Sequence, residues 1–125
     1  MKYIETKDAP KAIGPYSQAV KVDRFLFLSG QLPIKPETGE LIRDNFKEEV
    51  LQVLNNIEAI LKSLGCSRKD IVKTTVFLKD MNNFPEFNET YAEFFVQHKP
   101  ARSTVEVARL PKDARIEIEA IALVP

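Results

Sequence analysis

The chain has few of the residues that several common kinds of site require. It contains one cysteine and one histidine in 125 residues, so it cannot form an internal disulfide and is unsuited to a zinc site. No long apolar run predicts a membrane helix, and the opening MKYIETKDAPKA lacks the apolar stretch of a signal peptide. Eighteen basic residues balance eighteen acidic ones, which leaves no basic excess for nucleic acid or an anionic membrane. We therefore expect a cytoplasmic protein with no metal, no membrane contact and no nucleic-acid partner.

What the sequence does contain is a regular pattern of strands and helices. With 125 residues, 44% of them hydrophobic, residues 1–125 should form one domain. Helical spacing of apolar residues predicts one helix from Asp44 or Asn45 to Leu64 and a second within 81–98. Strand patterns occur at 2–5, 18–22, 24–30, 71–79, 102–108 and 116–124. This order predicts an α+β fold, a single sheet with two helices packed on one face.

Side-chain alternation assigns the residues of the last two strands to faces of the sheet. The apolar positions are Ser103, Val105, Val107, Ile116, Ile118, Ala120 and Ala122. The polar positions between them are Arg102, Thr104, Glu106, Glu117 and Glu119. If the apolar positions of both strands face the helices, the polar ones project together to the opposite face.

That opposite face does not have the composition of a surface exposed to water. Ile121 and Leu123 fall on it, and the strand RFLFLSG (24–30) is almost entirely apolar, so we expect it to be buried on both faces. A partner surface, most simply another copy of the chain, would cover these residues.

An arginine and a carboxylate on a covered face have two interpretations. One is a salt bridge between subunits. The other is a site for a small anionic substrate, in which arginine holds a carboxylate through two parallel hydrogen bonds and a glutamate orients water. Strand periodicity alone leaves both open.

Four segments, taken in order, resemble a known family over nearly the whole chain. They are AIGPYSQAV (12–20), FLSGQLP (27–33), DIVKTTVFLKDMNNFPEFNETYAEFF (70–95) and PARSTVEVARLPKDARIEIE (100–119). No single segment is diagnostic, but their order and spacing resemble the Rid family, also called the YjgF-type family of imine deaminases. Within it the chain is most similar to the RidA subgroup, the 2-iminobutanoate/2-iminopropanoate deaminases.

The resemblance implies a chorismate-mutase-like fold and a homotrimer with sheets inside, helices outside and three clefts between subunits. The implied substrates are 2-imino acids and their enamines, which water converts to 2-keto acids and ammonia without a cofactor. By position, Arg102 matches the residue that grips the substrate carboxylate and Glu117 the residue that positions the attacking water. The positions implied to line the pocket are Tyr16, Ser29, Gly30, Asn88 and Thr104. Glu119 is implied to be structural support.

Thr104 stands where many relatives have cysteine, so a thiol cannot be essential here, although the backbone N–H of Thr104 could still bind the carboxylate. The alternative function is a non-catalytic binder or sensor of small 2-keto acids in the same cleft. An RNA-directed role is disfavoured by the zero net charge.

Overall fold

The computed structural model describes residues 1–125 and has the predicted order of strands and helices. The strands are β1 (Lys2–Ile4), β2 (Ala19–Val22), β3 (Phe25–Gln31), β4 (Ile71–Leu78), β5 (Ala101–Glu106) and β6 (Ile116–Leu123). The helices are α1 (Phe46–Lys62) and α2 (Phe84–Phe94), with short 3₁₀ turns η1 (Arg68–Asp70), η2 (Met81–Asn83) and η3 (Pro111–Asp113).

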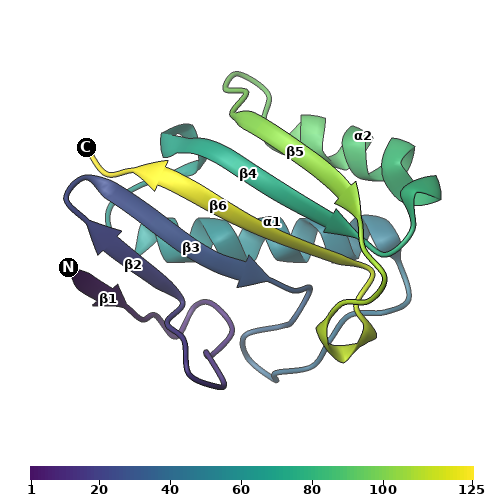
Figure 1. Ribbon diagram of the computed structural model, residues 1–125, viewed down its shortest axis with the longest axis horizontal. Coiled ribbons are helices and arrows are strands. Elements are labelled where there is room, and N and C mark those ends of the chain that lie inside the picture. The colour runs from purple at the N-terminus through teal and green to yellow at the C-terminus, as the bar shows by residue number, and fades with distance from the viewer.

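All six strands form one sheet in the order β1-β2-β3-β6-β4-β5 (Figure 1). The C-terminal strand β6 is inserted between β3 and β4 and runs antiparallel to both. β5 runs parallel to β4, because α2 forms the crossover that returns the chain to the same end of the sheet. β1 and β5 are therefore the two edges, and β6 and β4 lie in the interior.

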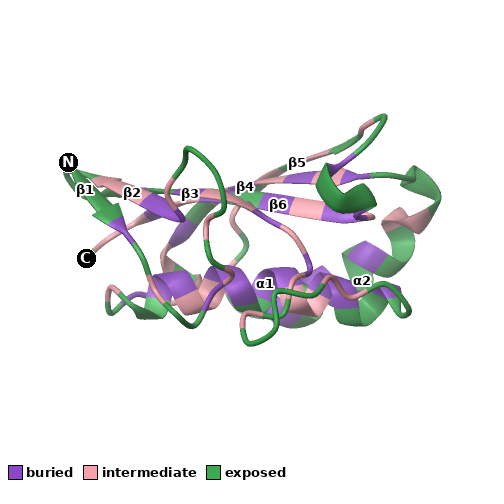
Figure 2. Cartoon of the chain, turned by 90° about the horizontal axis from the view of Figure 1, so that it is seen from below, coloured by how far each residue is buried: buried purple, intermediate pink, exposed green.

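Both helices cover the same face of the sheet, as predicted (Figure 2). α1 begins where expected, since the Asn45 side chain accepts a hydrogen bond from the Glu48 N–H at 3.0 Å. Its apolar stripe is buried, with Val50, Val53 and Leu54 fully enclosed against the sheet. Neither helix combines the length and apolar composition needed to cross a bilayer.

The face of the sheet opposite the helices, here called the open face, has no second layer in the chain. The prediction that β3 is buried on both sides is therefore wrong for one chain: Leu26 and Leu28 are buried, but Phe25 and Phe27 are 47% and 45% exposed. Val22 and Val105 also lie on this face with large exposed fractions. Such an apolar surface is typical of a face that binds a partner.

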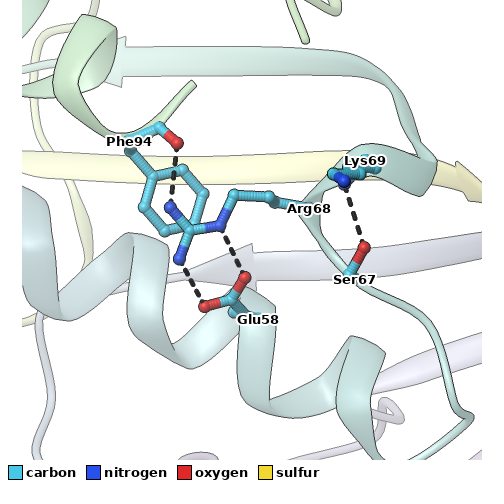
Figure 3. Close-up of polar contacts among 5 residues, drawn as sticks. All are labelled: Glu58, Ser67, Arg68, Lys69 and Phe94. Atoms are coloured by element: carbon cyan, nitrogen blue, oxygen red, sulfur yellow. Dashed lines mark hydrogen bonds and ion pairs between the residues drawn. The ribbon is translucent and has the colours of Figure 1, made fainter. Parts of the chain in front are cut away.

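A single arginine ties the start of β4 to both helices (Figure 3). The segment SRKD (67–70) forms one capped turn, and Arg68 projects from it. Its Nε and Nη2 donate to the two carboxylate oxygens of Glu58 in α1, each at 2.7 Å. Its Nη1 donates to the Phe94 carbonyl at the end of α2 at 2.8 Å, and its guanidinium lies over the Phe94 ring. The hydrogen bonds from Arg68 lower the pKa of Glu58 although burial opposes them.

We predict that Arg68→Ala lowers the free energy of unfolding by about 1–2 kcal/mol near neutral pH, because a two-bond ion pair and a helix C-terminal contact are lost. Chemical denaturation at one fixed protein concentration measures this change. Because the folded state holds the pKa of Glu58 below its ordinary value of 4.5, the contribution is complete above that pH and is lost as pH falls through the folded pKa. The difference in unfolding free energy between variant and wild type should therefore shrink in acid.

Lys69→Ala, on the neighbouring exposed side chain, is the matched control. An equal loss of unfolding free energy in both variants would contradict the prediction.

Candidate functional site

A cleft of about 840 Å³ opens beside the end of β3 and the start of β6. The N-terminal loop forms one wall and the loop that contains η3 forms another. Among its lining residues are four of the predicted site residues, Tyr16, Ser29, Gly30 and Glu117, together with Glu119. The structure thus brings together residues that lie about a hundred positions apart in the sequence.

Glu117 packs directly on the backbone of Gly30. A Cβ at position 30 would lie 2.6 Å from Oε2 of Glu117 and 2.8 Å from its Cδ, which is closer than real atoms approach. Glycine is thus required here to make room for the carboxylate rather than to permit an unusual backbone angle. The absent side chain of Gly30 fixes the height at which the carboxylate sits over the sheet.

The wall that contains Tyr16 is held by a buried glutamine. Gln18, 2% exposed, donates from Nε2 to the carbonyls of Thr6 and Pro10 at 3.0 and 2.8 Å and accepts from the Thr6 N–H at 2.7 Å. Ser29 donates from Oγ to the Ser17 carbonyl at 2.6 Å. The Gln18 bonds hold the N-terminal loop together and the Ser29 bond attaches it to the end of β3, while Tyr16 remains 54% exposed at the cleft.

Glu117 has no cationic partner within the chain, since none of the four salt bridges involves it. Burial raises its pKa, and the carboxylate of Glu119, two residues along β6, raises it further. A carboxyl group in a cleft whose pKa is raised holds a proton more readily than an ordinary glutamate, which suits it to proton transfer.

Arg102 occupies a second location, at the β5 edge and against α2. Its Nη1 donates to Oδ1 of Asn88 at 2.8 Å. Its ζ carbon lies 4.9 Å from the ring centroid of Tyr91, and 5.5 and 5.6 Å from those of Phe87 and Phe84. The guanidinium therefore rests on three aromatic rings and a neutral amide, in none of the four salt bridges, with N–H groups left for a ligand.

The predicted grouping of Arg102 and Thr104 with Glu117 on one face is wrong. Arg102 pairs with Thr74 and Thr104 with Val76, and both of these β4 partners are fully buried under the helices. Arg102 and Thr104 thus point to the helix side, whereas Glu117 pairs with Phe77 on the open face. The same register places the less polar residues of β5 on the open face.

The physical reason is that β5 is an edge strand. On an edge, a long polar side chain can cover apolar rings and still reach water, so the helix side does not demand apolar residues. Thr104 fits less easily, because its Oγ1 is buried without a hydrogen-bond partner in the chain.

Two features of the site were not anticipated from the sequence. One is the aromatic stripe of α2, whose edge, at Phe84, Phe87 and Tyr91, supports Arg102. Proximity of the stripe to the predicted Asn88 was the available signal. No local pattern pointed to Gln18.

Comparisons with known proteins agree over the full chain. The family model described as endoribonuclease L-PSP matches residues 6–124. A RutC family protein of Pyrococcus horikoshii is 59% identical over 119 residues, which cover 95% of this chain and 94% of the relative. The 2-iminobutanoate/2-iminopropanoate deaminase of Escherichia coli strain K12 is 52% identical over 125 residues, covering 98% and 97%. The crystal structure of E. coli TdcF with bound serine matches with a TM-score of 0.94 at 48% identity over 100% of both chains.

We predict that Gly30→Ala leaves the fold intact but moves the Glu117 carboxylate out toward water, because the flexible side chain yields more easily than the sheet. NMR titration of the Glu117 carboxyl should then give a lower pKa than in the wild-type protein, since burial is the main cause of its elevation. In a Glu117→Ala background, Gly30→Ala should cost no stability, because all three close contacts involve Glu117. An unchanged Glu117 pKa in the single variant would contradict this account.

Proposed function

The chain belongs to the endoribonuclease L-PSP family, which includes the YjgF and Rid proteins, and on that premise we propose that it is a hydrolytic deaminase of reactive 2-imino acids. The proposed substrates are 2-iminobutanoate and 2-iminopropanoate, with their enamine forms, and the products are 2-keto acids and ammonia. The observation that carries the proposal is a guanidinium and a carboxyl, Arg102 and Glu117, each half-buried and in no salt bridge. The E. coli relative at 52% identity is named for this reaction.

In this mechanism Arg102 binds the substrate carboxylate through two N–H groups. Asn88 then orients the guanidinium rather than the substrate, because its Oδ1 already accepts from Nη1. Glu117 takes a proton from the water that attacks the imine carbon. The Glu117 side chain lines the same cleft as Tyr16 and Ser29, which form one of its walls. A protonated imine is electrophilic by itself, so positioning supplies most of the required acceleration, and no cofactor is needed.

One chain alone does not form this site, because the sheet separates its two charged groups. Arg102 is on the helix side at the β5 edge, and Glu117 is on the open face of β6. We infer that the cleft is completed by Arg102 of the partner subunit. A homotrimer with the open faces inside would bury Phe25, Phe27 and Val105 in the same step. The serine bound in the TdcF relative supports a small amino-acid-like ligand for the family.

We predict that Arg102→Ala lowers kcat/KM by at least about a hundredfold, because the only fixed cation for the substrate carboxylate is lost. Arg102→Lys should lose about tenfold, since lysine keeps the charge but not the paired hydrogen bonds. The assay couples a threonine dehydratase to semicarbazide trapping and asks how far the protein suppresses trapping of the imine. Circular dichroism and sedimentation verify the fold and assembly of each variant. Full activity in Arg102→Ala would refute the assignment.

Mixing two inactive variants tests the shared site directly. Arg102→Ala and Glu117→Gln proteins, unfolded and refolded together in equal amounts, should recover about a quarter of the wild-type activity, because about one site in four then combines two intact residues from different copies. Each variant refolded alone is the control. If the mixture is as inactive as its components, Arg102 and Glu117 do not act across a subunit boundary.

The same preparations distinguish catalysis from binding alone. A sensor of 2-keto acids would bind 2-ketobutyrate in an Arg102-dependent way, as measured by calorimetry, without accelerating imine hydrolysis. A deaminase would show saturable turnover, and the wild-type protein should show it.

A further inference from the structure

Glu119 is a second carboxylate in the cleft, and it has no role in the reaction proposed above. It projects from the same face of β6 as Glu117, with Thr75 of β4 as its partner where Glu117 has Phe77. Both glutamates line the cleft, and neither takes part in any of the four salt bridges of the chain. Glu119 is exposed and Glu117 is half-buried, so β6 holds two carboxylates on one face with no salt bridge to either.

Few charged groups face Glu117 from the elements around it. Besides Glu119, the charged groups that line the cleft are Lys11 from the N-terminal loop and Lys112 from the loop before β6, and Tyr16 adds a neutral phenol. β3 contributes no charge. β4 places Phe77 beside Glu117, and the next open-face residue, Lys79, is bound to Asp113 at 2.6 Å. In the proposed trimer, Arg102 of the partner subunit would also face Glu117, and the bound substrate carboxylate would offset its charge.

The balance of these groups determines how strongly Glu117 holds a proton. Burial raises the pKa of Glu117, and the negative charge of Glu119 raises it further. Lys112 and Lys11 line the same cleft with exposed side chains, and neither contributes to the shift in the Glu117 pKa. Glu119 is thus the one negative side chain of the cleft that acts on Glu117, and it is fixed to the same strand.

We propose that Glu119, held on the same face of β6 and in the same cleft, assists proton transfer by Glu117, so that one side chain serves first as base and then as acid. The inference rests on the deaminase function proposed above. Glu119 touches neither substrate nor water in this account and acts only through Glu117.

The proton movements balance with Glu117 alone. The Glu117 carboxylate takes a proton from water as its oxygen bonds to the iminium carbon, which gives a neutral carbinolamine. The protonated carboxyl then returns that proton to the nitrogen, and the carbon–nitrogen bond breaks. The hydroxyl proton passes through Glu117 to the departing ammonia, which leaves a 2-keto acid and ammonium. A carboxyl with a raised pKa holds the proton for the second transfer more readily than a carboxyl of ordinary pKa.

The test is a titration of Glu117 itself, by NMR of its side-chain carboxyl carbon, with the signal assigned by comparison with Glu117→Gln. In Glu119→Gln the midpoint should fall by about half to one pH unit, because a neighbouring negative charge is removed. Glu89→Gln, which removes a negative charge from the exposed side of α2, is the matched control and should leave the midpoint unchanged. The acid limb of kcat/KM against pH should move with the midpoint in each variant.

Sedimentation establishes that each variant assembles like the wild type, and Glu119→Thr serves as a second neutral variant suited to a strand. An unmoved Glu117 midpoint in both Glu119 variants overturns the inference, whether or not assembly is weakened, and leaves the deaminase proposal standing if turnover persists. A moved midpoint in a protein that never deaminates supports the influence of Glu119 on Glu117 and overturns the proposed function instead.

Discussion

The alternation of side chains along β6 is the constraint on which the rest of the structure depends. β6 lies between β3 and β4 in the interior of the sheet, so every second residue must enter the helix layer, where Ile116 and Ile118 are fully buried. The residues between them must then point to the open face, and Glu117 is one of these. A shift of one residue in register would bury the glutamates and expose the isoleucines. Packing of the core therefore positions the carboxylate of the cleft.

The fold keeps the two charged groups of the proposed site apart, and each is stabilised without an opposite charge. Arg102 rests on the rings of α2 and on the neutral amide of Asn88. Glu117 is partly buried, and this burial raises its pKa and so favours its uncharged form. An internal ion pair would satisfy both groups and leave neither free for a ligand. Their location on opposite faces of one sheet makes that pairing impossible within a chain. Incomplete charge compensation in the monomer is thus what makes a shared site chemically useful.

Periodicity and caps predicted the order of elements, the helix layer and an apolar open face, because each depends on many residues acting together. The same alternation failed on β5. Alternation divides a strand into two sets of side chains but does not say which set faces the core. Hydrophobicity identifies the inward set only where one face of the strand is fully excluded from water. On interior β6 that condition holds, whereas on edge β5 a guanidinium can lie on the helix side. The sequence did not identify Arg68 or Gln18 as anchoring residues. Their partners, Glu58 for Arg68 and Thr6 for Gln18, are brought near them only by the tertiary structure.

Because a Cβ at position 30 would collide with the Glu117 carboxylate, a change at one position alters the other. A lineage that acquired a larger residue at position 30 would turn the side chain at position 117 out toward water or favour a shorter one, and would thereby lose the half-buried carboxylate of the cleft. Loss of the proton-transfer chemistry would then be visible as a substitution of Gly30, a residue that itself contributes no functional group. Among homologues, the pair should be inherited or lost together, and the glycine becomes a marker of whether a family member has kept its acid.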